Sequence, residues 1–169
     1  GVKMNQFDFL SPTRLVVGKD AEKETGKWIK EFGGTTVLVH HDSGFMKQNG
    51  FVDKVIHMLR EDGLKVVELG GVVPNPHLSL VYEGIELCKK EGVDFLLAIG
   101  GGSVIDSTKA IAMGLPYEGD VWDFFVEEDG VPHDVPTKST PLGVILTIAA
   151  TGSEASNSCV ITKADENLK

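Results

Sequence analysis

Apolar residues of this chain gather in short runs that alternate with longer amphipathic stretches. The clearest run is 95–99, five apolar residues without a polar break, which is too short for a core helix and suits a strand buried on both faces. Further strands are predicted at 7–9, 14–17, 35–40, 66–69, 143–147 and 160–162. Helical spacing predicts helices over 20–32, 51–59, 78–88 and from 103 to just before Gly114. This alternation predicts an α/β fold with a doubly wound, mainly parallel sheet.

Three glycines, Gly100 to Gly102, directly follow the 95–99 run and precede a helix. Such a turn aims backbone N–H groups at an anion, most often a phosphate, and a Cβ would block the close approach. We expect Ser103 to cap the helix and Asp106 to complete a Ser-x-x-Asp capping box. A purely structural turn fits the same spacing, because Ile105 stands where the usual dinucleotide fingerprint has a third glycine.

Composition and charge narrow the class of protein. The 169 residues fit one domain, 1–169, with a sizeable core. A formal net charge of −9 argues against nucleic acid as a partner. No apolar run approaches the ~18–20 residues of a membrane span, and no signal segment opens the sequence, so we expect a cytoplasmic protein without a membrane partner. Residues 1–3, ahead of Met4, are interpreted as a tag remnant.

Cysteines and histidines give no sign of a disulfide or a metal site. Cys88 and Cys159 lack a Cys-x-x-Cys spacing, and we expect Cys88 to be a small core residue. The histidines show neither a His-x-x-x-His pattern nor a compact cluster, which favours surface or loop positions for His40, His41, His57, His77 and His133.

Ligands of open α/β sheets bind beyond the carboxyl ends of the strands. Asp42 lies just past the first interior strand, where a carboxylate accepts the ribose hydroxyls of an adenosine and repels a 2′-phosphate. The alternative is a turn-forming Asp ahead of Ser43 and Gly44. Asn75 stands between two prolines and has a restricted backbone, for which a turn is again the ordinary explanation. Four loops are candidates for this edge: 40–44, 70–76, 100–103 and 147–153.

Several motifs together resemble the iron-containing (group III) alcohol dehydrogenase family. They are Ser11-Pro12-Thr13-Arg14 with Gly18, Pro74-Asn75-Pro76, Gly100-Gly101-Gly102-Ser103-x-x-Asp106-x-x-Lys109-Ala110, Tyr117-Glu118-Gly119-Asp120-x-Trp122-Asp123 and Thr147-x-x-x-Thr151-Gly152-Ser153-Glu154. The resemblance covers essentially the whole chain and is strongest to the butanol dehydrogenase and broad-range aldehyde reductase branch. It implies a Rossmann-like dinucleotide-binding domain, truncated before a helical, metal-binding C-terminal domain.

The resemblance also implies which residues contact the cofactor. Thr147, Thr151 and Ser153 would contact nicotinamide and diphosphate, and Val160 and Lys169 match cofactor-lining positions. The predicted cofactor site comprises Asp42, Ser43, Gly44, Asn75, Gly101, Gly102, Ser103, Asp106, Thr147, Thr151, Ser153, Val160 and Lys169. Relatives of the aldehyde reductase type carry a glycine-rich loop with a serine that admits a 2′-phosphate. Residues 41–45 depart from it, so NAD is favoured and NADP stays open.

By the same resemblance, the full-length protein transfers hydride between NAD(P) and a primary alcohol or aldehyde. Its Fe²⁺ or Zn²⁺ would be bound by one Asp and three His beyond residue 169, so no catalytic or metal-binding residue is assigned here. We expect this chain alone to be inactive and to self-associate, or to form a homodimer. The alternatives are a glycerol or glycerol-1-phosphate dehydrogenase or a dehydroquinate-synthase-like domain, which match the Pro-Asn-Pro and Tyr-Glu-Gly-Asp segments less well, or a freestanding nucleotide-binding module.

Overall fold

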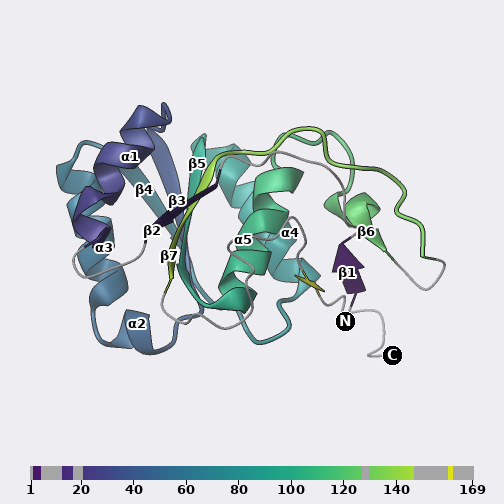
Figure 1. The fold of residues 1–169 in the computed structure, drawn as a ribbon, viewed down its shortest axis with the longest axis horizontal. Helices are drawn as coiled ribbons and strands as arrows, with labels where there is room; N and C mark the ends of the chain where they lie inside the picture. The colour runs from purple at the N-terminus through teal and green to yellow at the C-terminus, as the bar shows by residue number, and fades with distance from the viewer. Residues whose placement is uncertain (1, 5–12, 17–20, 127–129, 147–159, 162–169) are drawn as a thin grey trace.

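The computed structural model describes residues 2–4, 13–16, 21–126, 130–146 and 160–161 (Figure 1). Its strands are β1 Val2–Met4, β2 Thr13–Val16, β3 Thr36–His40, β4 Lys65–Leu69, β5 Phe95–Gly100, β6 Phe125–Val126, β7 Leu142–Leu146 and β8 Val160–Ile161. Its α-helices are α1 Thr25–Glu31, α2 Phe45–Gln48, α3 Phe51–Glu61, α4 Leu78–Glu91 and α5 Gly102–Gly114, and the 3₁₀ turns are η1 Ala21–Glu24 and η2 Val121–Phe124.

A five-stranded sheet in the order β2-β7-β5-β3-β4 forms the centre of the molecule, and every neighbouring pair in it is parallel. The chain winds outward from β3 to β4 on one side and from β5 to β7 on the other. The loops after β3 and β5 therefore leave the sheet in opposite directions at its centre. In open α/β sheets this switch point is where ligands bind. The predicted doubly wound, mainly parallel α/β sheet is confirmed.

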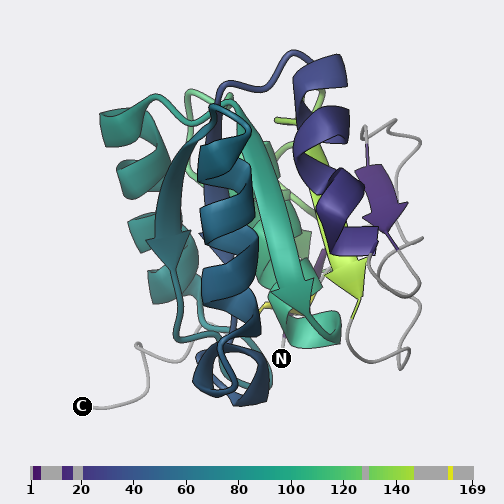
Figure 2. The same ribbon diagram turned by 90° about the vertical axis from the view of Figure 1, so that its left-hand side faces the viewer.

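Helices cover both faces of this sheet (Figures 1 and 2). Side chains of β5 alternate between the two faces, and all six of its residues are buried. Leu97 packs in the core that includes residues of α1 and α3, whereas Leu96 packs in the core of α4 and α5. A strand enclosed in this way has no polar face, which explains its unbroken apolar sequence.

Two predicted helices differ from the structure, and the elements η2, β6 and α2 were not predicted. The helix expected over 20–32 is split into η1 and α1, and the helix after the glycine turn continues through Gly114. Residues 116–141, where periodicity is weak, contain η2 and β6. α2 has only four residues, which is too short to produce a recognisable period. The strand predicted at 7–9 lies outside the described residues.

A second, antiparallel sheet has the order β6-β1-β8. Its central strand β1 includes Val2 and Lys3, two of the three residues interpreted as a tag remnant. The strand expected at 160–162 is present as β8, which also contacts α5.

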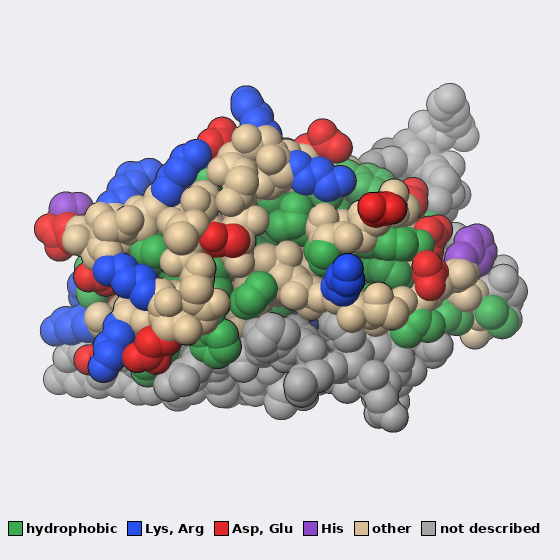
Figure 3. All heavy atoms as spheres, turned by 90° about the horizontal axis from the view of Figure 1, so that it is seen from above, with side chains coloured by type: hydrophobic (Ala, Val, Ile, Leu, Met, Phe, Trp, Pro, Cys, Tyr) green, Lys and Arg blue, Asp and Glu red, His purple; other side chains and the backbone are tan. Residues whose placement is uncertain are grey.

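Asp94, directly before β5, is hydrogen-bonded to the start of β3. Its carboxylate accepts hydrogen bonds from the Thr35 N–H at 2.9 Å, the Thr36 N–H at 3.0 Å and the Thr35 hydroxyl. Burial raises the pKa of this carboxyl, but the bonds from Thr35 and Thr36 outweigh it and hold the pKa below its ordinary value. Figure 3 shows the molecule from above the view of Figure 1, with acidic and basic side chains scattered among apolar ones on that face.

We predict that Asp94→Ala lowers the free energy of unfolding by about 1–3 kcal/mol, because the two amide groups lose charged acceptors. Chemical denaturation measures this loss, and Glu86→Ala on the exposed side of α4 is the control. Equal midpoints for the Asp94→Ala variant and the wild type would contradict the assigned role.

Candidate nucleotide site

The glycine turn ends β5 and starts α5 at the centre of the sheet. Gly100 has a φ of 153°, and a Cβ there would lie 2.7 Å from Val104 Cγ2, so only glycine fits. Gly101 is extended and its carbonyl accepts the first bond of α5, from the Ile105 N–H at 3.1 Å. The N–H groups of the first turn have no acceptor within a helix. They lie in the partly exposed stretch 101–103 and are available to an anion.

The predicted capping box is wrong. The N-cap is Gly101, whose side chain offers no acceptor, and no side-chain cap hydrogen bond is made. Ser103 is therefore already inside the first turn, and Asp106 lies buried in the second turn. Because Gly101 is the N-cap, the helix starts two residues earlier than a cap at Ser103 would place it.

Beyond its first turn α5 is enclosed by the protein, since every residue from Val104 to Gly114 is buried. Thr108 satisfies its hydroxyl within the helix by donating to the Val104 carbonyl at 2.7 Å. Ser107 instead contacts β3, where its Oγ lies 2.8 Å from His40 Nε2. The partly exposed N-terminal turn thus belongs to a helix whose other residues are buried in the core.

His40 is a fully buried strand residue, so its predicted surface or loop position is wrong. Its Nδ1 lies 2.7 Å from the Leu69 carbonyl, an acceptor only, and therefore carries the proton. Nε2 then accepts the Ser107 hydroxyl. Burial lowers the pKa of His40 to about 4, with the adjacent His41 adding to the decrease and the Leu69 bond opposing it. His40 is neutral near pH 7 and joins β3, β4 and α5.

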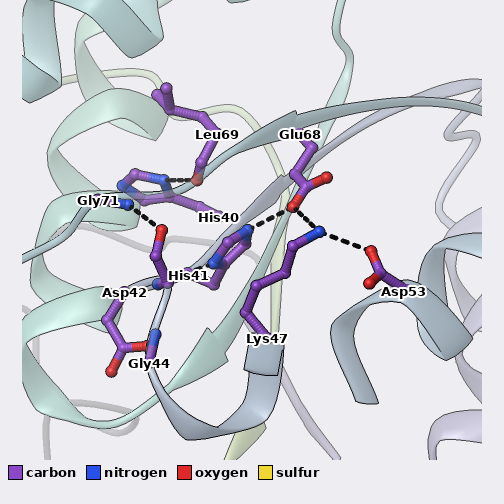
Figure 4. Close-up of polar contacts among 10 residues, drawn as sticks. His40, His41, Asp42, Gly44, Lys47, Asp53, Glu68, Leu69 and Gly71 are labelled. Atoms are coloured by element: carbon purple, nitrogen blue, oxygen red, sulfur yellow. Dashed lines mark hydrogen bonds and ion pairs between the residues drawn. The ribbon is translucent and has the colours of Figure 1, made fainter. Parts of the chain in front are cut away.

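The loop after β3 forms a tight turn (Figure 4). Asp42 Oδ1 accepts the Gly44 N–H at 2.7 Å, which is the geometry of an Asx turn. Ser43 adopts a left-handed φ of 64°, and its Oγ accepts the Gly71 N–H at 2.9 Å. Asp42 is exposed, so its carboxylate serves the turn and still faces solvent at the switch point.

His41 is also buried, contrary to the prediction, and connects this turn to a charged network. Its Nδ1 accepts the Ser43 N–H at 2.9 Å, and its Nε2 lies 2.7 Å from Glu68 Oε2. Lys47 Nζ lies 2.9 Å from the same Glu68 oxygen and 2.6 Å from Asp53 Oδ1. Burial raises the pKa of Glu68, but hydrogen bonds from Lys47 and His41 outweigh it, and the net pKa is lowered. Bonds to Asp53 and then Glu68 raise the pKa of Lys47.

The structure thus brings two parts of the predicted site together at the switch point, Asp42 to Gly44 and Gly101 to Ser103. Asn75 lies in the exposed loop after β4 with a left-handed φ of 56°, which asparagine tolerates better than most residues. Val160 lies in β8 of the second sheet. The predicted residues Thr147, Thr151, Ser153 and Lys169 lie outside the described residues.

Sequence reasoning missed the supporting roles of His41, Glu68 and Lys47. The one available signal was a pair of adjacent histidines at the end of an apolar strand, because imidazoles there are placed to bond with neighbouring loops. The partners come from β4 and α2, and only the folded chain shows them.

Comparison with known proteins decides the family. The family model for iron-containing alcohol dehydrogenases matches residues 12–169. The chain belongs to this family. The resemblance inferred from its motifs is confirmed.

Relatives in the iron-containing alcohol dehydrogenase family have different named cofactors. The chain is 45% identical over 166 residues to the "Probable NADH-dependent butanol dehydrogenase 2" of Bacillus subtilis strain 168, covering 98% of this chain and 41% of that protein. It is 34% identical to the "NADPH-dependent aldehyde reductase YqhD" of Escherichia coli, covering 95% and 40%. The crystal structure of NADH-dependent butanol dehydrogenase A from Thermotoga maritima superposes with a TM-score of 0.76 at 43% identity, covering 88% and 36%. The chain spans about two fifths of the curated relatives it matches.

The metal that the family name implies has no fitting site among the described residues. They hold no group of three or more His, Cys, Asp or Glu side chains that could bind an ion. Cys88 is a buried core residue, as expected, and burial raises the pKa of its thiol to about 12. No helix in the described ranges has the length and apolar character needed to cross a membrane.

We predict that His40 makes stability depend on pH. Its folded pKa of about 4 lies below the unfolded value near 6.5, so the unfolded chain binds the extra proton and stability falls as pH drops through this window. Between pH 7 and pH 5 the loss from this residue is about 2 kcal/mol. Urea denaturation of wild type and His40→Asn at both pH values measures it. A wild-type loss no larger than that of the variant would show that His40 titrates normally.

Proposed function

We propose that this chain is the cofactor-binding domain of a metal-dependent alcohol dehydrogenase or aldehyde reductase that transfers hydride between a nicotinamide dinucleotide and a primary alcohol or aldehyde. The observation that carries the proposal is the meeting of the glycine turn and the Asp42 turn at the switch point of a parallel sheet. Family membership and the names of the relatives support the class of reaction.

The diphosphate is assigned to the N-terminus of α5. The amide groups of Gly101, Gly102 and Ser103 lie where the strand gives way to the helix, and their partial positive charge favours a phosphate. Because α5 is buried from Val104 onward, these donors are held in place before the ligand arrives. Little conformational entropy is then lost on binding.

The adenosine ribose is assigned to Asp42, next to the turn that binds the diphosphate. The exposed carboxylate can accept both ribose hydroxyls of NAD, whereas the 2′-phosphate of NADP would meet a like charge. The neutral His40 behind it cannot offset that repulsion. We therefore propose NAD as the preferred cofactor.

The bound nicotinamide supplies or accepts the hydride, and the role of this chain is to fix its orientation. We retain Asn75, Asp106, Thr147, Thr151, Ser153, Val160 and Lys169 as proposed cofactor contacts. The described residues do not fit a catalytic metal, and we assign them no part in metal chemistry. We propose that Fe²⁺ or Zn²⁺ is held by other parts of the full-length protein.

We predict that Gly102→Val in the full-length protein abolishes NADH binding and leaves folding nearly unchanged, because a branched side chain would occupy the path of the diphosphate. Gly102→Ala, with a single methyl group, should lose less affinity. Isothermal titration calorimetry measures both variants, with thermal unfolding as the check on folding. Wild-type affinity in a folded Gly102→Val protein would contradict the phosphate assignment.

We predict that the full-length enzyme prefers NADH and that Asp42→Asn removes most of this preference. The Asn oxygen can still accept the Gly44 N–H, so the turn remains while the charge is lost. Like charges 4 Å apart repel by roughly 4 kcal/mol at an effective dielectric constant near 20, and a third of that is about tenfold in selectivity. The ratio of kcat/KM for the two cofactors measures it. If wild type prefers NADPH, or Asp42→Asn leaves the ratio unchanged, Asp42 is only a turn residue.

A further inference from the structure

His41, the residue before Asp42, has a buried imidazole ring that accepts a hydrogen bond from the backbone of the Asp42 turn. We propose that His41 is a positioning residue for cofactor selection, because its Nδ1 holds the Ser43 N–H and thereby keeps the Asp42 carboxylate at the ribose position. The inference rests on the proposed function, since it concerns the ribose side of that nucleotide site.

The environment of His41 fixes one tautomer. Glu68 is an acceptor only when ionised, and its contact with Lys47 keeps it in that state. The proton of His41 therefore sits on Nε2, directed to Glu68, and Nδ1 keeps its lone pair for the Ser43 N–H. Figure 4 shows the His41 ring between the Asp42 turn on one side and Glu68 and Lys47 on the other.

The backbone of His41 is anchored as firmly as its ring. Its N–H donates to the Leu69 carbonyl at 3.2 Å, and its carbonyl accepts the Val72 N–H at 3.3 Å. The side chain is buried, with 3% of its surface exposed. Both the backbone and the ring of His41 are thus held in place, and the exposed Asp42 follows it directly in the chain.

Ser43 has a left-handed φ of 64°, which is unfavourable for a residue with a Cβ and therefore requires stabilising contacts. Three hydrogen bonds from outside the turn hold it there: the Ser43 N–H to His41 Nδ1, the Gly71 N–H to Ser43 Oγ, and a long one from Gln48 Nε2 to the Ser43 carbonyl. Without the lone pair of His41, the Ser43 N–H loses its acceptor and the backbone can relax toward negative φ. The Asp42 carboxylate would then no longer be held in one orientation.

Gly70 provides the space for this arrangement. A Cβ at Gly70 would collide with Ser43 Oγ and with His41 Cε1. A methyl group on residue 70 would therefore push the Ser43 and His41 side chains out of their observed positions. Gly70→Ala thus disturbs the same turn while residue 41 remains a histidine.

Two substitutions of His41 separate its two hydrogen bonds. In His41→Asn, the amide oxygen lies where Nδ1 was and can accept the Ser43 N–H, while the contact with Glu68 is lost. In His41→Gln, the longer amide reaches toward Glu68 and leaves the Ser43 N–H without its acceptor. Exposed His57 on α3 supplies the matched control, His57→Gln.

The test uses the full-length protein and titrates it with NADH and with NADPH, following nucleotide fluorescence. We expect His41→Gln and Gly70→Ala to reduce the NADH-over-NADPH affinity ratio by about tenfold, equivalent to the loss of one net hydrogen bond. His41→Asn and His57→Gln should stay within about threefold of the wild-type ratio. At saturating NADH, kcat should not change, because the nicotinamide end is untouched. Thermal unfolding confirms that each variant is folded.

Equal loss of the ratio in His41→Asn and His41→Gln would overturn the inference, as would a wild-type ratio in His41→Gln. If His41→Gln does not fold, a wild-type ratio in Gly70→Ala overturns it instead. Failure of the proposed function looks different: wild type itself would then bind neither nucleotide, and the inference would be rejected with it.

Discussion

The burial of β5 and α5 in the core determines where the loops of the candidate site leave the sheet. β5 is buried on both faces, and α5 returns directly across one of those faces, buried along all but its first turn. The chain must reverse direction between them within the space of Gly100 and Gly101, and the conformation of Gly100 allows this without a collision with Val104. The partly exposed N–H donors of α5 are consequently confined to the end of the sheet where β3 also terminates.

Two neighbouring histidines at the end of β3 carry out different tasks there. His40 points into the core and bonds to β4 and α5, which fixes the helix relative to the sheet. His41 bonds to the Asp42 turn and to Glu68, which fixes the turn relative to the sheet. Each ring has a hydrogen-bond partner at both of its nitrogens. The C-terminal end of β3 thus positions both α5 and the Asp42 turn.

Much of this fold could be predicted from the sequence, because buried parallel strands leave unbroken apolar runs such as 95–99. The helix start after the glycine turn could not, since serine is the commoner cap and only the extended Gly101 shows that the helix begins earlier. The burial of His40 could not either, because its partners Leu69 and Ser107 are distant in sequence. Motif spacing indicated the correct family, as the match over residues 12–169 confirms. All of the predicted cofactor contacts, before and after residue 146, stay predictions.

We propose that the turn after β5 binds the diphosphate of a nicotinamide dinucleotide while the turn after β3 binds its adenosine ribose. The decisive experiment is a crystal structure of the full-length protein with NADH bound. We expect diphosphate oxygens about 3 Å from the N–H groups of residues 101–103, and both hydroxyls of the adenosine ribose hydrogen-bonded to the Asp42 carboxylate. A diphosphate bound away from the N-terminus of α5, or a ribose out of reach of Asp42, would contradict it.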